Sequence, residues 1–238
     1  MPIPMRLPLA LTLLLASVPA AAQTEPPAFH VIAFTTGATT MSVDPINAVL
    51  TQANFAGLSN DGISYGATAH YAFGRALLGA NYSQTVFGEE GLSNGRTDAL
   101  TSRQFAGTAS LVVFNTSHLI FYPTLGVGMG TFDVILRDRS GGAAASASQP
   151  TFAEVAQSPG TESIVSGRHL LYSAGAGIDY LVTRAPGDAF GIVFGVRGGL
   201  FLAPNRTTWM LGSRTVVAGP DASAGGPFVR VVVGIGHR

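Results

Sequence analysis

The chain has 238 residues, of which 47% are hydrophobic and only 11% are charged, and its formal net charge is zero. All 13 basic residues are arginine, and the chain contains no cysteine. A neutral chain of this composition lacks the basic face that holds a nucleic acid, so we expect no nucleic-acid partner. The cysteine count excludes disulfides, thiolate catalysis and cysteine-ligated zinc, and the hydrophobic content argues against a disordered chain.

Residues 1–22 have the pattern of a secretory signal peptide. A short segment with one positive charge, residues 1–6, precedes an apolar run at residues 7–18, and Ala20 and Ala22 form an A-x-A cleavage site before Gln23. An N-terminal membrane anchor is the alternative, but the apolar run is shorter than the roughly 18 to 20 residues that span a bilayer. We therefore expect export, with cleavage near Ala22–Gln23 and a mature domain of residues 23–238.

After this leader, hydrophobicity alternates with a period of two residues, which is the periodicity of β-strands. In residues 169–182, for example, Leu170 and Ile178 share an apolar face, whereas Gly175 and Asp179 lie on the opposite face. Every apolar stretch after the leader is interrupted too early for a transmembrane helix. The eight expected strands are residues 29–36, 63–73, 76–87, 103–114, 119–136, 169–182, 190–202 and 228–237.

The second face of these strands indicates which side meets solvent. It consists mostly of Gly, Ser and Thr with isolated Arg, Asp and His, which suits a packed barrel interior better than bulk water. The apolar face then meets lipid, and a closed barrel lets strands cross a bilayer without unpaired backbone groups. The outward set includes Leu125, Val127, Ile192 and Val231, and the inward set includes Gly126, Arg197 and Arg230.

The connections between the expected strands alternate strictly between short and long. The short ones are residues 74–75, 115–118 and 184–189, and the long ones are 37–62, 88–102, 137–168 and 203–227. Outer-membrane barrels show this asymmetry, with short periplasmic turns and long external loops. Aromatic residues at the strand ends predict two interfacial girdles: Tyr71, Phe73, Phe121, Tyr180 and Phe190 beside the short turns, and Tyr65, Phe105 and Tyr172 beside the long loops.

Two strand sequences carry a resemblance to a known group of proteins. Tyr122-Pro123-Thr124-Leu125-Gly126-Val127-Gly128 and Val231-Val232-Val233-Gly234-Ile235-Gly236, together with the leader, resemble the OmpA/OmpW-like eight-stranded outer-membrane β-barrel proteins of Gram-negative bacteria. The resemblance implies an all-β, antiparallel, up-and-down transmembrane barrel. It also implies outer-membrane lipids and lipopolysaccharide as partners, and it implies no cofactor. Such proteins commonly end in Phe, whereas this chain ends in His237-Arg238.

Two features of the long loops stand out. Asp44 and Pro45 precede an amphipathic pattern, which predicts a short helix with Asp44 as N-cap and Pro45 as its first residue. This helix either rests on the barrel rim, which we favour, or forms a lid or docking surface. In the last loop, Trp209 and Met210 either pack on the outer rim, again the favoured interpretation, or form an exposed contact surface.

Several motifs invite a catalytic interpretation but lack its context. Residues 91–95 match G-x-S-x-G, yet they lie between antiparallel strands, so we expect a plain turn. The glycines at 126, 128 and 130 lack dinucleotide-binding spacing and are expected to face inward. A membrane hydrolase site built from His70, His169 and a serine is the catalytic alternative, but no tight His–Ser motif accompanies these histidines. The five histidines show no metal-ligand spacing.

The candidate site is structural. Asp179, Arg197 and Arg230 are expected on the inward faces of the last three strands, where an unpaired charge is expensive. We therefore expect them to form an ion-pair network that closes the lumen, in preference to a gate or a ligand site.

The expected function follows from the size of the barrel. The interior of an eight-stranded barrel is just wide enough to be filled by side chains, which favours a non-enzymatic protein with an envelope-structural or surface-interaction role through its long loops. A narrow conduit for small apolar solutes or ions is the first alternative. An envelope enzyme or a secreted lipocalin-like binder is the second.

Overall fold

Eight long strands pair edge to edge around a closed ring. The structure is a computed structural model, and it describes residues 29–92, 94–185, 189–204, 207–222 and 225–237; the expected signal peptide, residues 1–22, lies outside them. The strands of the ring are β1 (His30–Thr40), β2 (Asp61–Phe73), β3 (Ala76–Gly91), β4 (Arg96–Leu111), β6 (Leu119–Asp138), β7 (Glu162–Thr183), β8 (Phe190–Leu202) and β11 (Gly226–His237).

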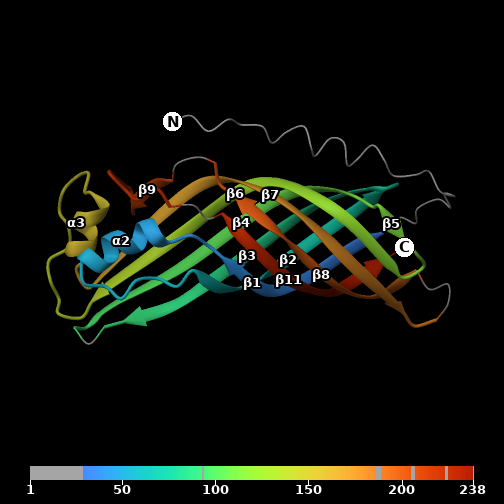
Figure 1. Cartoon of the computed structure of the whole chain (residues 1–238), viewed down its shortest axis with the longest axis horizontal. Helices are drawn as coiled ribbons and strands as arrows, with labels where there is room; N and C mark the ends of the chain where they lie inside the picture. Colours follow the sequence, from blue (N-terminus) through green and yellow to red (C-terminus); the bar gives the residue numbers. More distant parts are fainter. Residues whose placement is uncertain (1–28, 93, 186–188, 205–206, 223–224, 238) are drawn as a thin grey trace.

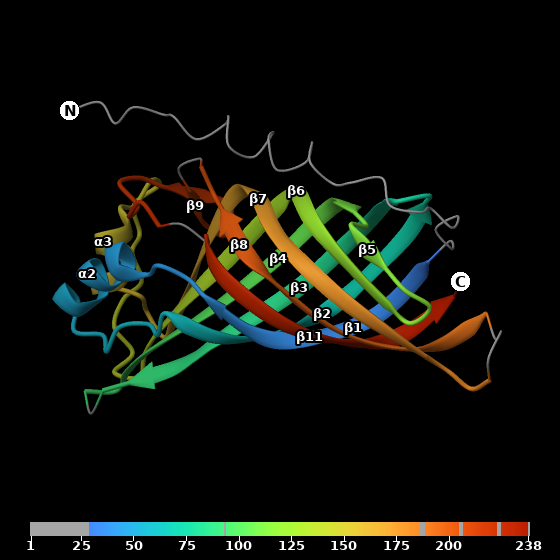
Figure 2. The same ribbon diagram turned by 45° about the vertical axis from the view of Figure 1, so that its right-hand side comes forward.

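Each strand of the ring pairs antiparallel with the strand before and after it, and β11 closes the ring by pairing with β1 (Figure 1). Closure pairs every strand of the ring on both sides in the middle of the barrel, which a structure embedded in lipid requires. The expected fold class, an eight-stranded antiparallel up-and-down transmembrane barrel, is therefore confirmed. The strands cross the barrel axis at a marked tilt (Figure 2).

Five smaller elements lie in the connections between the strands of the ring. They are α2 (Asp44–Gln52), β5 (Phe114–Asn115), α3 (Phe152–Gln157), β9 (Thr208–Leu211) and β10 (Arg214–Val216). The β9–β10 hairpin pairs with β7 near the start of that strand. Neither helix among the described residues is long and apolar enough to cross a membrane.

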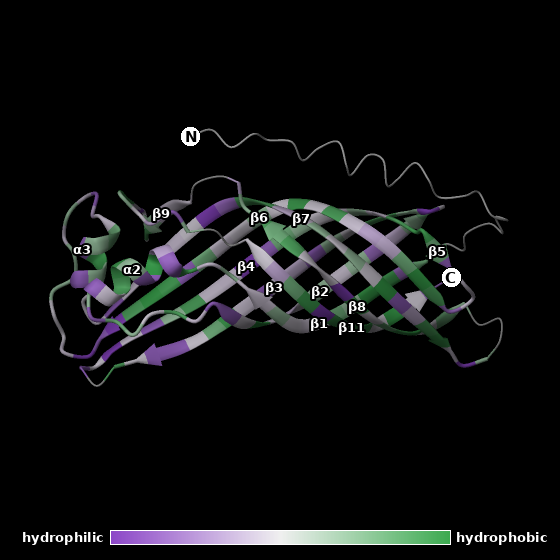
Figure 3. Cartoon of the chain, viewed as in Figure 1, coloured by the Kyte–Doolittle hydropathy of each residue, from purple (hydrophilic) through white to green (hydrophobic). Residues whose placement is uncertain are grey.

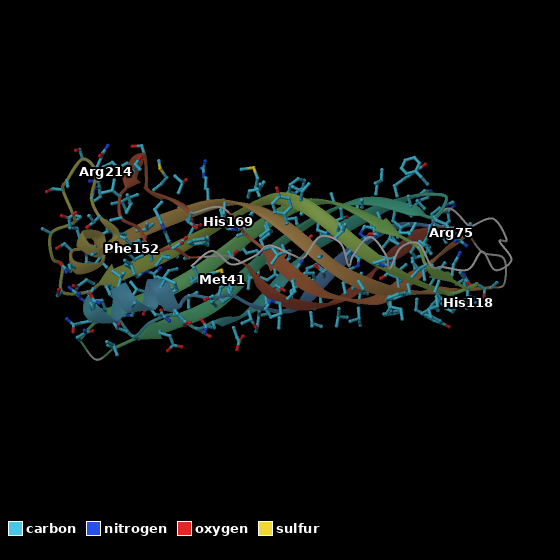
Figure 4. All side chains as sticks on the ribbon, turned by 45° about the horizontal axis from the view of Figure 1, so that its top comes forward. Met41, Arg75, His118, Phe152, His169 and Arg214 are labelled. Atoms are coloured by element: carbon cyan, nitrogen blue, oxygen red, sulfur yellow. The ribbon has the colours of Figure 1, made fainter. Side chains whose placement is uncertain are left out.

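The two ends of the barrel differ as the connection lengths predicted. The hairpin at residues 74–75 and the turns after β5 and β7 lie at one end, where β1 starts and β11 stops with His30 opposite His237. The helices and the β9–β10 hairpin lie at the other end. Arg75 and His118 mark the short-turn end in Figure 4, and Phe152 and Arg214 mark the long-loop end.

The outer surface between the ends carries an apolar belt. Leu125, Val127, Ile192 and Val231 are each about half exposed (49–54%), whereas Arg197 and Arg230 are buried inside the ring. The orientation expected from the strand pattern is therefore confirmed. The eight aromatic residues of the two expected girdles are also exposed on this outer face, and hydrophilic residues gather at the strand tips and loops of the long-loop end (Figure 3).

The polarity of the wall reverses toward the long-loop end, and β6 shows the change within one strand. Val127 and Met129 face outward, but the next outward residues are Thr131 and Asp133, and the inward positions 132, 134 and 136 are all apolar. From Thr131 onward the wall approaches the inside-apolar, outside-polar pattern of a protein in water. Ile135 and its register partner Ile164 are the apolar exceptions on the outward face of β6 and β7. We infer that this reversal marks the outer boundary of the lipid belt.

The reversal explains why several expected strand ends were wrong. β4 begins at residue 96 instead of 103, β7 begins at 162 instead of 169, β3 continues to 91, and β1 continues to 40. A search for outward apolar residues stops where the outward residues turn polar, although the strand itself continues. By contrast, β8 has the expected bounds, and β2, β6 and β11 differ from theirs by two residues.

Helices α2 and α3 and the β9–β10 hairpin, with their connecting loops, form what we call the cap. Its buried side chains include Ile46 and Leu50 of α2, Phe152 and Val155 of α3, and Trp209 of β9, packed on apolar residues from the barrel walls. The indole of Trp209 lies 4.9 Å from both Phe132 and Phe152, measured between ring centroids, and donates a 2.9 Å hydrogen bond to the carbonyl of Pro220.

Two expectations about these loops need correction, and one helix was not expected. Helix α2 is present and rests on the barrel, as favoured. Its N-cap, however, is Val43, and Asp44 lies in its first turn, where the helix dipole stabilises a carboxylate. Trp209 packs inside the cap instead of on the outer rim. Helix α3 was not expected, although Thr151 and Glu154 form a capping box that the sequence already contains.

Candidate functional site

The lumen is filled at three levels. The cap core closes the long-loop end, and a set of apolar side chains that we call the lower plug fills the short-turn end. The lower plug consists of Val31, Leu77, Ile120, Leu181, Val193 and Val232, all buried. Between these two apolar levels lies a polar cluster made of Thr68, His70, Ser83, Gln104, Tyr122, Asp179, Arg197 and Arg230, all buried.

Asp179 is the anionic centre of the polar cluster. Its carboxylate is completely buried, accepts a 2.8 Å hydrogen bond from the Tyr122 hydroxyl, and forms a 3.3 Å ion pair with the guanidinium of Arg197. All three side chains come from neighbouring strands, namely β6, β7 and β8. A buried ion pair of this kind is costly to break, because removing one partner leaves the other charge uncompensated.

Arg197 also links the ion pair to the opposite wall of the barrel. Its Nη1 donates to the Thr68 hydroxyl at 2.7 Å and lies 3.3 Å from Nε2 of His70, both on β2. Nε2 of His70 also lies 3.2 Å from the Thr68 hydroxyl. The network therefore spans the lumen from β8 to β2.

Arg230 stands apart from this ion pair. Its Nη2 donates to Ser83 at 3.0 Å, and its guanidinium lies 4.9 Å from the ring centroid of Phe228 and 5.3 Å from that of Phe201. Among the described residues, no carboxylate lies within ion-pair distance of Arg230. Of the three residues expected to form one network, the structure thus brings Asp179 and Arg197 together and leaves Arg230 with a hydroxyl and two aromatic faces.

The bulky side chains of the polar cluster lie over glycines of the adjacent strand. Tyr122 is the register partner of Gly177, Asp179 of Gly195, and His70 of Gly79. A Cβ added at each of these glycines would collide with its partner's side chain. The inward glycines therefore provide the space that a narrow barrel needs to hold a phenol, a carboxylate and an imidazole.

The glycines at 126, 128 and 130 face inward, as expected. Gly130 lies opposite His169, whose ring fills the space that a side chain at 130 would take. Gly91 ends β3 and Gly95 has a φ of +84°, as a turn requires, although Ser93 lies outside the described residues.

Arg96 joins the cap to the barrel wall. Its Nε donates to Asp138 at 3.0 Å, Nη1 donates to the carbonyl of Ala53 just after α2, and Nη2 donates to the carbonyl of Gln157 at the end of α3. Both carbonyls belong to helix C-terminal turns, where a cation is favourable. One side chain thus fixes both helices on β4 and β6.

Asp98, two residues further along β4, is a buried carboxylate beneath the cap. Burial raises its pKa from 3.8 to about 6, the backbone N–H of Gly57 opposes this rise with a 3.1 Å hydrogen bond, and Glu90, its register partner on β3, adds repulsion. Its second oxygen, Oδ1, has no hydrogen-bond partner among the described residues. Near neutral pH, keeping the charged carboxylate of Asp98 in this position therefore lowers the stability of the folded state.

The residues proposed for a hydrolase are not brought together. His70 contacts Thr68 and Arg197, whereas the ring of His169 packs 5.5 Å from that of Phe132, with neither nitrogen hydrogen-bonded within the described chain. Neither histidine contacts a serine hydroxyl there. No group of three or more potential metal ligands occurs among the described residues.

Sequence reasoning missed half of this site. Tyr122, Thr68 and Ser83 lie on inward strand positions, but they were not singled out because they carry no charge. The signal that identifies Tyr122 is its register partner, since a large inward residue opposite an inward glycine is accommodated by that glycine. That pairing requires the register between strands, which hydrophobic periodicity does not provide.

No protein-family model matches the chain, and no curated protein matches it in sequence. Among solved structures, the chain is similar to Neisserial surface protein A (NspA), at 13% identity over 88% of this chain and 96% of that one, with a TM-score of 0.44. It is also similar to Ail, the attachment invasion locus protein of Yersinia pestis, solved in complex with the heparin analogue sucrose octasulfate (12% identity, 88% and 97% coverage, TM-score 0.43). A third structure is the outer membrane protease OmpT from Escherichia coli (8% identity, 91% and 99% coverage, TM-score 0.34).

Proposed function

We propose that this protein is a non-enzymatic barrel of a Gram-negative outer membrane, exported by a signal peptide at residues 1–22. In this proposal the mature chain, residues 23–238, is a sealed membrane anchor that presents the cap outside the cell. Its role is envelope-structural or surface-interacting, and the cap is the part that meets a partner.

The filled lumen is the observation that carries this proposal. A pore needs a continuous path, but the lower plug, the polar cluster and the cap core follow one another along the axis. Each level is made of buried side chains from several strands, so opening a path requires repacking and not the movement of one loop. This arrangement favours an anchor over the narrow conduit considered above.

The cap supports a surface role because it is built as a folded unit. Helix α3 has a complete capping box, Arg96 binds both helix ends, and the cap shares one hydrophobic core with the barrel wall. A preorganised surface loses less conformational entropy on binding than a flexible loop does. The cap therefore suits recognition of a partner at the cell surface.

We further propose lipopolysaccharide as the lipid partner at the outer boundary of the belt. Arg103, Thr131 and Arg168 are register partners in one row across β4, β6 and β7, and both arginines are exposed on the outward face. Asp133 pairs with Arg103 at 2.9 Å, which leaves Arg168 without an acid among the described residues. Guanidinium groups at this height suit phosphate groups at the lipid surface.

Fractionation and conductance together test the proposal. The full-length chain, expressed in a Gram-negative host, is expected in the outer-membrane fraction, and unboiled and boiled samples are expected to migrate differently on a gel. The purified protein is expected to give no single-channel steps in planar bilayers. Export as a detergent-free soluble protein would contradict the anchor, and steady conductance would favour the conduit instead.

A further inference from the structure

Two arginines face each other in the middle of the barrel. Arg197 on β8 and Arg230 on β11 are register partners, and both side chains are buried in the lumen. Like charges placed directly opposite each other in a sheet repel. The polar cluster holds one carboxylate, that of Asp179, and this group pairs with Arg197.

The positive charge of Arg230 is therefore not balanced by any acid of the described chain. Arg230 is 6% exposed, and its neighbours are the Ser83 hydroxyl and the faces of Phe201 and Phe228. A hydroxyl and two aromatic quadrupoles stabilise a cation less than a counter-charge does, and an uncompensated buried charge is rarely tolerated.

A small cavity lies beside both guanidinium groups. It has a volume of about 40 Å³ and is lined by Arg197, Arg230, Thr108 and Asn81 among others. The Nε atoms of both arginines and the hydroxyl of Thr108 have no hydrogen-bond partner among the described residues. Organic ligands occupy pockets of roughly 300 Å³ or more, so this cavity accommodates only a monatomic ion or a few water molecules.

We propose that this cavity is a binding site for one small monovalent anion of the halide class, held between Arg197 and Arg230. The anion supplies the counter-charge that the sequence omits and accepts hydrogen bonds from the unpartnered donors. Since the lower plug and the cap core close both ends of the lumen, the anion is a structural ligand incorporated on folding. This inference concerns the stability of the barrel and goes beyond its proposed surface role.

Anion-dependent stability tests the site directly. The full chain, folded in detergent micelles, is heated at constant total salt while sodium chloride replaces sodium gluconate, and the folded and unfolded bands are separated on a gel without boiling. Above the dissociation constant, each tenfold increase in chloride is expected to raise the folding equilibrium constant about tenfold. Arg230→Met is expected to remove this dependence and to be more stable than the parent protein in gluconate. Arg75→Met, at an exposed position of the short-turn end, is the matched control and is expected to keep the full response.

Diffraction supplies a second readout that needs no variant. Crystals of the unmodified protein, refolded and crystallised in sodium bromide, are expected to show an anomalous peak between the guanidinium groups of Arg197 and Arg230. Equal stability in chloride and gluconate, or ordered water without bromide in this cavity, would overturn the proposal. If Arg230→Met fails to fold, the bromide peak in the unmodified protein decides the question.

Discussion

Asp179 and Gly195 are register partners on β7 and β8, and the carboxylate of Asp179 occupies the space that a side chain at position 195 would need. The same relationship joins Tyr122 to Gly177 and His70 to Gly79. The position of each polar side chain therefore depends on the glycine opposite it as well as on its own hydrogen bonds.

This relationship predicts the effect of a single methyl group. Gly195→Ala is expected to displace Asp179 and to lower the free energy of unfolding by about 1–3 kcal/mol, the usual cost of overpacking a core. The measurement is the urea midpoint followed by heat-modifiable gel mobility. Gly107→Ala is the control, because its nearest contact would be the carbonyl oxygen of Val127 at 3.9 Å. We expect a change below about 0.5 kcal/mol there, and equal effects of the two substitutions would contradict the account.

Removal of the central carboxylate tests the ion pair. Asp179→Ala leaves Arg197 uncompensated and Tyr122 without its acceptor, and it is expected to cost about 3–5 kcal/mol of stability. Asp133→Ala, which breaks the outer-face pair with Arg103 and the 2.6 Å hydrogen bond from Ser166, is expected to cost about 1–2 kcal/mol. Conductance in planar bilayers is expected to remain absent in Asp179→Ala and Arg197→Ala, because the lower plug persists. If both variants keep the stability of the parent protein, the network does not hold the lumen together.

The cap has its own reporter, because Trp209 is the single tryptophan of the chain and is buried there. Arg96→Gln removes the contacts with Asp138 and with both helix ends, and is expected to destabilise the cap by about 1–3 kcal/mol. The fluorescence of Trp209 should then shift to the red at lower denaturant concentration, while gel mobility reports an intact barrel. Arg139→Gln, at an exposed position, is the control. A loss of the barrel together with the cap would show that the two do not unfold separately.

Asp98 gives the cap a pH dependence of known sign. Because its folded-state pKa of about 6 lies above the ordinary value of 3.8, the folded state binds the proton more tightly. The contribution of Asp98 to the free energy of unfolding is therefore most favourable below about pH 4. This contribution falls as the pH rises from about 4 to about 6, and Asp98 destabilises the folded state at higher pH.

Asp98→Asn isolates this contribution, since an asparagine still accepts the N–H of Gly57. The variant is expected to match the parent protein near pH 4 and to have a more stable cap by about 1–2 kcal/mol at pH 7.5, measured by Trp209 fluorescence in urea. A variant that is less stable at pH 7.5, or a difference that does not change with pH, would contradict the role of Asp98.

The belt was predictable because lipid imposes a simple rule. Every second residue must be apolar over the thickness of the bilayer, so Leu125, Val127 and Ile192 could be placed on the outer face from spacing alone. The short hairpin at residues 74–75 likewise follows from two adjoining periodic segments.

The cap and the lumen contents were less predictable for two physical reasons. Above the lipid the wall reverses its polarity, so Leu100 and Val165 point inward on the ends of β4 and β7 that a lipid-facing pattern does not detect. Inside the lumen, partners come from strands that are distant in sequence, as with Arg197 and Thr68. Their proximity depends on barrel closure and register, and neither property is visible in a single strand.

The reversal of polarity along β6 is the claim on which the membrane anchor depends, and spin-label accessibility tests it most directly. The chain contains no cysteine, so single cysteine variants from 125 to 136 can each carry one nitroxide on the full-length protein in liposomes. We expect oxygen accessibility to peak at 125, 127 and 129, accessibility to a water-soluble nickel reagent to peak at 131 and 133, and both to be low at 132, 134 and 136. Oxygen peaks at the even positions 126 and 128, or high nickel accessibility at 127, would contradict the account.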